Sequence, residues 1–384
     1  MKKDTFRKVM HFIHLWLGLI SGLIVTIVAI TGCIYAFEPE FRSLLQSYQN
    51  VEIQHAPFLS PSALKEKAMP YVYATPSDSA NAVYGVTYET ADKAAKLAYN
   101  DAEAGYTIML LNPYTGAYIH QEALKSDFFR IILAGHRSLW LPYSIGHQIV
   151  GWGIFAFLLV IVSGIVVWIP KRWSKRSLKN LFTFTWKGSV FKKSYDLHRV
   201  LGGYAILFAL VFAITGLTWS FPWFGNAYYR LLSGGKALDK WAPALSDTTA
   251  TATVKNPVDQ LWQQALNDYP IGKQGSFMFD FPQQSTDAYR ICYNPDLGTY
   301  YKRHFRFFDQ NTLKELKGGG LYGINPKEAS TADTIYRMTY DLHVGAVGGF
   351  LGRLLMFCFS FIIATLPITG VVMWWKRKKT RNGQ

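Results

Sequence analysis

Charged residues are scarce in this chain of 384 residues: Asp, Glu, Lys and Arg make up 17% of it, whereas hydrophobic residues make up 50%. Soluble domains contain about 25% charged residues, so this balance argues against an ordinary soluble protein. The deficit lies in four runs without any charge, at residues 15–37, 149–169, 200–221 and 354–375. Each run reaches the roughly 20 residues that cross a bilayer core as a helix. We therefore predict four membrane spans.

Cysteine is also rare, with three residues in the whole chain. Cys33 and Cys358 fall inside spans, which leaves Cys292 alone elsewhere, so no intrachain disulfide is expected. The string Ile-Thr-Gly-Cys at 30–33 is similar to the site at which bacterial lipoproteins are cleaved, so a cleaved signal is an alternative to the first span. The span is favoured, because Ile-Thr-Gly recurs at 214–216 and 368–370 without cysteine.

The chain lacks a separate basic domain, although its net charge is +15, so nucleic acid is not an expected partner. The basic residues instead flank the spans, before residue 9, between 171 and 193, and after 375. Basic residues concentrate on the cytoplasmic side of membrane helices, so we predict that these segments and both termini are cytoplasmic. Membrane lipid is an expected partner. We expect a multi-pass protein of the bacterial inner (cytoplasmic) membrane with two periplasmic domains.

The two halves of the chain repeat a pattern. Each half has His-x-x-x-Gly, at 14–18 and 198–202, and then Thr-Gly 18 residues after the histidine, with glycine at 32 and 216. Each half then has a second histidine, His136 or His343, followed after 28 or 27 residues by the glycine of Ser-Gly or Thr-Gly. Matched separations of this kind predict two copies of one unit, a helix, an exported domain and a helix.

Each exported segment reads as a small α+β domain. Residues 61–69 and 257–269 predict short helices with proline in the first turn. Strand-like runs follow, at 84–90, 94–100 and 106–111 in the first copy and at 276–281, 288–293 and 300–308 in the second. The predicted fold class is therefore an all-α four-helix transmembrane bundle built from two repeats, with two small α+β exported domains.

These predictions divide the chain into seven parts. They are an N-terminal cytoplasmic segment with the first span (1–39), the first exported domain (40–130), the second span with a preceding interfacial segment (131–170), a basic cytoplasmic loop (171–197), the third span (198–222), the second exported domain (223–340), and the fourth span with a basic cytoplasmic tail (341–384).

Histidines lie near the ends of the predicted spans. His14 and His198 fall on the cytoplasmic side, and His136 and His343 on the exported side. A polar side chain at a span is costly to bury, so it normally faces the bundle interior and has a partner. Contact with lipid headgroups is the alternative for any single histidine. Their matching places in both halves favour two facing pairs.

Two facing imidazoles indicate haem ligands better than zinc ligands. Zinc takes four ligands, commonly with cysteine or carboxylate among them, and neither accompanies these histidines inside the spans. A porphyrin supplies four nitrogens, so haem needs only two axial ligands from the protein. We predict two haems, one bound by His14 and His198 and one by His136 and His343. The lack of a Cys-x-x-Cys-His site for covalent attachment favours b-type haem. No catalytic side chain is assigned.

Neighbouring residues suit supporting roles. Gly18 and Gly202 lie one helical turn after the cytoplasmic-side histidines, where they leave room either for a flat macrocycle or for close helix packing. Arg137, Arg199 and Arg353 suit pairing with haem propionates or with lipid phosphates.

Two further histidines are alternate ligands. His11 lies on the same helical face as His14, three residues earlier. His147 is an alternate to His136, because Pro142 between them breaks a helix and leaves the register open.

Several of these motifs together resemble one protein family over nearly the full chain. They are "HLWLG" at 14–18, "DLHRVLG" at 196–202, "DLHVGAVGGFLGR" at 341–353 and "PITGVVMWW" at 367–375, with "LNPYTGAYI" at 111–119 similar to the end of a PepSY-type domain. The chain resembles the PepSY-associated transmembrane family (PepSY_TM), some members of which are called iron-regulated membrane proteins. The resemblance implies that both exported domains are PepSY-like.

The resemblance also implies an activity, because the family includes haem-containing reductases that take iron from ferric siderophores. We therefore expect a haem-dependent ferric-siderophore (ferric-chelate) reductase that transfers electrons through two haems and releases iron on the periplasmic side. Some relatives carry a flavin or NAD(P)H reductase domain, which we do not recognise here, so a separate donor is expected, a quinol or a cytoplasmic reductase. The alternatives are a non-catalytic PepSY-domain membrane protein that binds or regulates a periplasmic partner, and a permease subunit.

Overall fold

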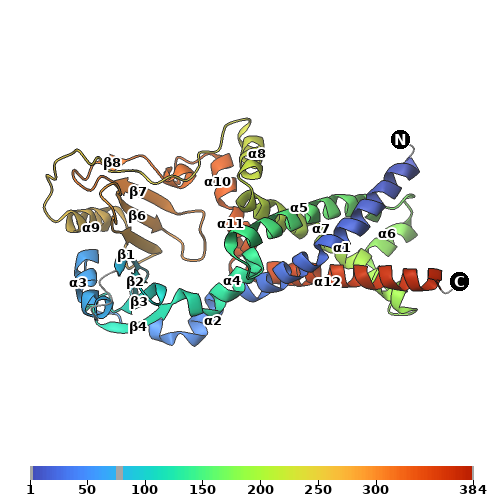
Figure 1. Cartoon of the computed structure of the whole chain (residues 1–384), viewed down its shortest axis with the longest axis horizontal. Coiled ribbons are helices and arrows are strands. Elements are labelled where there is room, and N and C mark those ends of the chain that lie inside the picture. Colours follow the sequence, from blue (N-terminus) through green and yellow to red (C-terminus); the bar gives the residue numbers. More distant parts are fainter. Residues whose placement is uncertain (1–2, 75–80, 383–384) are drawn as a thin grey trace. The chain divides into compact units, whose positions relative to one another are not determined.

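The computed structural model describes residues 3–74 and 81–382, and the chain divides into two compact units (Figure 1). The helical unit comprises the residues up to Glu38, Ile131–Tyr228 and the residues from Asp341 on. The sheet unit comprises Pro39–Arg130 and Tyr229–Tyr340. Residues 1–2 and 383–384 of the predicted cytoplasmic ends, and 75–80 of the first exported segment, lie outside the described residues.

Helices build the first unit. Its elements, three of which extend into the sheet unit (α4, α8 and α11), are α1 (Lys3–Tyr35), α4 (Phe128–Ser138), α5 (Tyr143–Trp168), α6 (Lys175–Phe182), α7 (Val190–Ser220), α8 (Pro222–Ser233), α11 (Thr339–Val344), the 3₁₀ turn η5 (Ala346–Gly348) and α12 (Gly349–Asn382).

Four helices within the described residues are long and apolar enough to cross a membrane. They cover Thr5–Tyr35, Tyr143–Trp168, Val190–Ser220 and Ala346–Lys378. Each contains nearly all of one predicted apolar run, so the prediction of four helices of membrane-crossing length is confirmed. The protein is a membrane protein on this ground.

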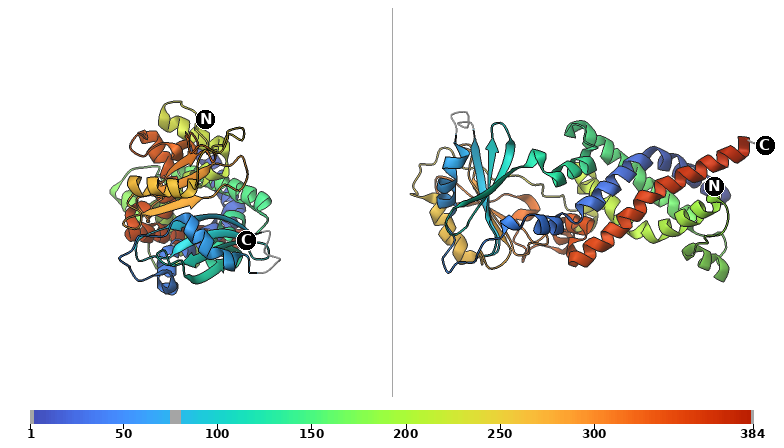
Figure 2. Two further views of the ribbon diagram at one scale, coloured as in Figure 1. Left: turned by 90° about the vertical axis from the view of Figure 1, so that its left-hand side faces the viewer. Right: turned by 90° about the horizontal axis from the view of Figure 1, so that it is seen from below.

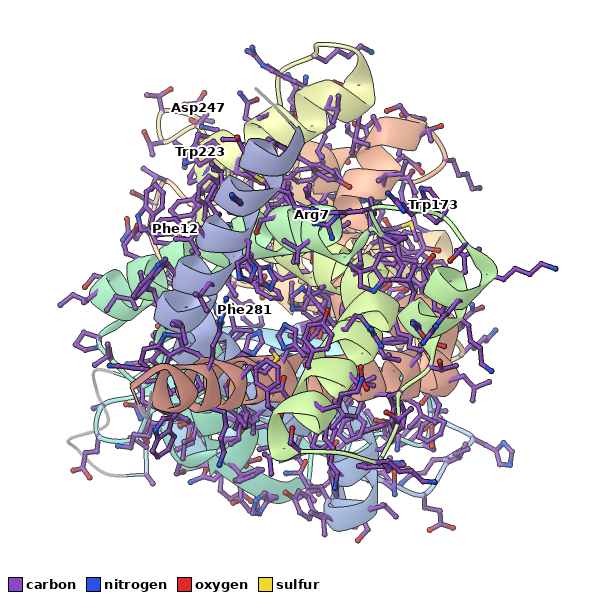
Figure 3. The ribbon with its side chains drawn as sticks, turned by 90° about the vertical axis from the view of Figure 1, so that its right-hand side faces the viewer. Arg7, Phe12, Trp173, Trp223, Asp247 and Phe281 are labelled. Carbon is purple, nitrogen blue, oxygen red and sulfur yellow. The ribbon has the colours of Figure 1, made fainter. Side chains whose placement is uncertain are left out.

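The four long helices pack into a bundle. Helix α1 packs against α5 and α12, and α7 packs against the same two helices, so α1 and α7 lie diagonally across it (Figure 3). The interior holds small residues at every fourth position of α7, Ala205, Ala209 and Ala213, which let the helices approach closely. Arg7 donates to the carbonyl oxygens of Val167 and Ile169 at 2.5 and 2.8 Å, which binds the start of α1 to the end of α5.

Within residues 39–74, 81–130 and 229–340, one antiparallel sheet of eight strands forms the centre of the sheet unit, in the order β4-β3-β2-β1-β5-β6-β7-β8. The strands are β1 (Ala82–Tyr88), β2 (Ala95–Asp101), β3 (Gly105–Leu111), β4 (Tyr118–Ala123), β5 (Ser276–Asp280), β6 (Tyr289–Asn294), β7 (His304–Phe308) and β8 (Glu315–Leu316). The other elements are α2 (Glu38–Leu45), α3 (Pro61–Val72), α9 (Pro257–Asp268), α10 (Thr331–Arg337) and the 3₁₀ turns η1 (Ser47–Gln49), η3 (Leu124–Ser126) and η4 (Gly320–Gly323).

The sheet unit differs from the two separate exported domains that we predicted from the sequence. Strand β1 from the first segment pairs with β5 from the second, with Val86 opposite Phe279. Gly85 makes the close approach possible, because a Cβ there would lie 2.5 Å from the Phe279 carbonyl oxygen. The two segments therefore form one α+β domain, joined at the strand edges that each copy would otherwise expose.

One hydrophobic core contains side chains of both segments. Helices α3 and α9 lie on one face of the sheet (Figure 2), and Leu64 of α3 and Trp262 of α9 belong to the same buried cluster as Phe277 and Leu97 of the strands. Both helices start with proline at the first position, as predicted. Ser60 caps α3 by accepting from the amide of Ala63.

Candidate functional site

The helical unit brings four histidines together as two pairs. His14 of α1 and His198 of α7 face each other with ring centroids 6.0 Å apart and ring planes at 88°. His136 of α4 and His343 of α11 repeat this arrangement, at 6.0 Å and 85°. All four rings are partly buried. Each pair joins a residue of the first half of the chain to one of the second half.

Short helices carry His136 and His343, and both end before the long helix begins. After α4, Leu139 and Trp140 have φ of 54° and 58°, and α5 starts directly after Pro142. After α11, Gly345 has φ of +78°, and a Cβ there would lie 2.4 Å from the Gly352 carbonyl oxygen. The helix break that Pro142 predicted is confirmed, and it separates His136 on α4 from His147 on α5.

The Nδ1 atom of each histidine has an oxygen acceptor on another helix. His14 Nδ1 donates to the Val160 carbonyl at 3.0 Å, His136 Nδ1 to the Val28 carbonyl at 2.9 Å, and His198 Nδ1 to the Leu366 carbonyl at 3.1 Å. A carbonyl only accepts, so Nδ1 carries the proton and Nε2 of the neutral ring keeps its lone pair. That is the tautomer of a metal-ligating histidine that is oriented through its other nitrogen.

His343 differs, because its Nδ1 lies 2.8 Å from the Thr215 hydroxyl. The rings of Phe212 and Trp219 are close by, with centroids 5.3 and 5.1 Å from that of His343. The environment of this imidazole is thus more aromatic than that of the other members of the pairs.

Each histidine ring of the two pairs lies against the glycine of a Ser-Gly or Thr-Gly dipeptide on another helix. The sequence interpretation missed this role of the dipeptides. A Cβ added at Gly164 would lie 2.9 Å from His14 Cε1, and one at Gly32 would lie 3.2 Å from His136 Cε1. Gly370 faces His198 and Gly216 faces His343 at 3.8 and 3.9 Å by the same measure. The sequence contained a signal for this role, since the dipeptides recur four times in step with the four histidines.

The residues at each pair fit a haem. Metal–imidazole bonds of about 2 Å put the centroids of two rings that ligate one iron from opposite sides roughly 6 Å apart, close to the separation here. Gly18 and Gly202, one turn after His14 and His198, leave room for a methyl group, because a Cβ there would lie at ordinary van der Waals distances of 4.0 and 3.9 Å from Val160 and Leu366. Across residues 3–74 and 81–382 no cluster of three or more His, Cys, Asp and Glu side chains suits a metal ion, so the donor set of each pair is two imidazoles.

Comparison with known protein families finds a match for this chain. The family described as "PepSY-associated TM region" matches residues 12–377. The chain belongs to the PepSY-associated transmembrane family. No curated protein matches it. In this family member the match spans all four long helices and both histidine pairs, and the resemblance noted from the sequence motifs is confirmed.

The three arginines named from the sequence contact protein groups. Arg199 pairs with the buried carboxylate of Asp196 at 3.0 Å and lies over the ring of Tyr195. Arg137 donates to the Tyr143 hydroxyl at 2.8 Å and lies over its ring. Arg353 lies partly buried in the first turns of α12. A role toward haem propionates stays a prediction for all three.

The alternate histidines lie outside the pairs. His147 is on α5, where its ring stacks on Tyr143 with centroids 4.8 Å apart. His11 is exposed on α1. The geometry therefore favours His136 over His147, and His14 over His11, as the partners of the second-half histidines.

Proposed function

We propose that this membrane protein is a dihaem electron-transfer protein that reduces a ferric siderophore on the periplasmic side and so releases iron. The observation that carries the proposal is the centroid separation of 6.0 Å in both imidazole pairs. A haem b at each pair would supply one-electron transfer, since two axial imidazoles leave no position for oxygen or substrate. His14, His198, His136 and His343 would hold the two haems, and no side chain is assigned a catalytic role.

We interpret the two halves of the chain as repeats. Each half contributes one histidine to each pair, so equivalent residues face each other. The strand order, with β1 and β5 adjacent at the centre and each half running outward from there, supports the same twofold relation. An axis of this kind would make the pairing of equivalent histidines obligatory.

The basic residues support an orientation with both termini in the cytoplasm. Arg7 and Lys8 lie near the start of α1, the segment 171–193 links α5 to α7, and Lys376 to Lys378 end the fourth span. Figure 1 shows the start of α1, helix α6 and the end of α12 at the same end of the helical unit, and by the positive-inside rule this end would be cytoplasmic. His14 and His198 would then lie near the cytoplasm, and the sheet unit would be periplasmic.

The electron would come from a separate molecule, a quinol or a cytoplasmic reductase. Each ferric ion takes up one electron, and the donor is oxidised by the same amount. Reduction releases the metal because hard catecholate or hydroxamate oxygens hold the ferrous ion far more weakly than the ferric ion.

Purified protein tests the proposal directly. Pyridine haemochrome analysis of the protein in detergent should find two haems b per chain, and a value clearly below one would contradict the haem sites. Protein reduced with a stoichiometric amount of dithionite under anaerobic conditions should reoxidise when a ferric siderophore is added. A spectrum that stays reduced with catecholate and hydroxamate chelates alike would contradict the reductase assignment while leaving the haem sites in place.

A further inference from the structure

Two threonine hydroxyls contact histidines of the pairs as hydrogen-bond acceptors. Thr215 Oγ1 lies 2.8 Å from His343 Nδ1 and donates its own hydrogen to the Val211 carbonyl at 2.5 Å. Thr369 Oγ1 lies 2.9 Å from His198 Nδ1 and 2.8 Å from the Leu366 carbonyl. A hydroxyl whose hydrogen is committed to a carbonyl presents a lone pair to its other neighbour, so each threonine accepts from the Nδ1–H of a histidine.

The histidines of the first half are bonded differently. His14 Nδ1 bonds to the Val160 carbonyl, while the nearby Ser163 hydroxyl donates to carbonyls of its own helix at 2.7 and 3.0 Å. His136 Nδ1 bonds to the Val28 carbonyl at 2.9 Å and lies 3.4 Å from the Thr31 hydroxyl. Each pair thus combines one imidazole held mainly by a carbonyl with one in short contact with a hydroxyl.

The two hydroxyls are not equivalent. His198 Nδ1 also has the Leu366 carbonyl at 3.1 Å, so that nitrogen keeps an acceptor when the Thr369 hydroxyl is removed. Among the described residues, Thr215 is the acceptor for His343 Nδ1. Loss of its hydroxyl would leave a buried N–H without a partner, beside the rings of Phe212 and Trp219.

We infer that Thr215 and Thr369 are positioning residues that orient His343 and His198 and lower the redox potential at the two pairs, with the larger effect at Thr215. This inference rests on the proposed haem sites. A bond from Nδ1–H to an acceptor makes Nε2 a stronger electron donor and fixes the direction of the ring. A stronger donor stabilises the ferric state, so removal of the acceptor should raise the potential.

Valine substitutions test the inference, because valine keeps the shape of threonine and removes the hydroxyl. Thr215→Val should raise the midpoint potential of one of the two haems by about 59 mV, the equivalent of a tenfold change for one electron. Thr369→Val should raise that of the other haem by less. The matched controls are Thr218→Val and Thr365→Val, since these hydroxyls bond at 2.7 Å to carbonyls of their own helices. Both controls should leave the potentials unchanged.

Conservative rescue separates positioning from a general loss of structure. Thr215→Ser keeps the hydroxyl and should restore the potential to that of the original protein. A potential that is unchanged in Thr215→Val, or shifted equally in Thr218→Val, would overturn the inference. A Thr215→Ser variant that behaves like Thr215→Val would overturn it as well.

A second readout does not need haem. In haem-free protein with ¹⁵N-labelled histidine, the Nδ1 resonance of His343, assigned by its loss in His343→Ala, should show a protonated, hydrogen-bonded nitrogen that changes in Thr215→Val. If the unsubstituted protein never binds haem, that result would contradict the proposed function and leave the hydrogen bond between His343 and Thr215 in place. An Nδ1 resonance that is identical in Thr215→Val would overturn the present inference alone.

Discussion

The close contact between Gly164 and the ring of His14 can be tested with alanine substitutions at two equivalent glycines, Gly164 and Gly370. In Gly164→Ala the new methyl carbon would lie 2.9 Å from Cε1 of His14, which is closer than real methyl contacts, and 3.1 Å from Nδ1, which is tighter than most of them. In Gly370→Ala it would lie 3.8 Å from Cε1 of His198, an ordinary van der Waals distance. Both variants add the same atom to the same pair, one on each side.

The two substitutions are expected to change the stability of the bundle in opposite directions. Overpacking of a filled site costs about 1–3 kcal/mol, and in Gly164→Ala the His14 ring has to move away from the Val160 carbonyl, to which it bonds at 3.0 Å. Gly370→Ala avoids that cost and gains up to about 1 kcal/mol from the higher helix propensity of alanine. We expect Gly164→Ala to lower the melting temperature of the bundle and to retain one haem per chain, and Gly370→Ala to retain two.

The assay combines helical circular dichroism during heating with pyridine haemochrome analysis of each purified variant. Gly105→Ala is not a suitable control for a glycine-to-alanine change, because the positive φ of 75° at Gly105 would strain the backbone of an alanine at that position. The reasoning would be refuted by equal melting temperatures and equal haem contents for Gly164→Ala and Gly370→Ala, since the two then would not differ in the fit of the methyl group.

Three further predictions concern other residues. His198→Ala should remove one haem and His343→Ala the other, each leaving about one haem per chain by haemochrome analysis; loss of both haems in either variant would contradict separate sites. His147→Ala should keep both haems, because its ring stacks on Tyr143 outside the pairs; loss of one haem would make His147 a ligand. Burial raises the pKa of Asp127, but bonds that include the one from Arg42 at 2.7 Å outweigh it and leave the pKa below its ordinary value. Asp127→Asn should therefore lower the free energy of unfolding at pH 7 by about 1 kcal/mol, and the difference should shrink as the pH falls below about 4, which urea unfolding at several pH values measures.

Local patterns in the sequence were sufficient for several features. An apolar run of span length has to become a helix in a bilayer, because its backbone polar groups find no other partners there, and the four runs are such helices. Proline at the first turn indicated α3 and α9 for a similarly local reason, since it needs no amide donor at that position. The matched spacing of the four histidines indicated which of them share a pair, and the structure brings those residues together.

Tertiary structure alone decided three other features. The pairing of β1 with β5, which merges two expected domains into one sheet, uses backbone groups that are the same in every strand edge, so the sequence does not show which distant edge they meet. The break around Pro142 left His136 and His147 as alternatives, and only the tertiary contacts of the two rings separated them, with His343 for His136 and with Tyr143 for His147. The sequence shows the Ser-Gly and Thr-Gly dipeptides as parts of the repeated pattern. Their contact with the histidines, however, depends on which face of one helix meets a histidine of another. That contact is made between residues more than 100 positions apart, and helical periodicity within either segment carries no information about it.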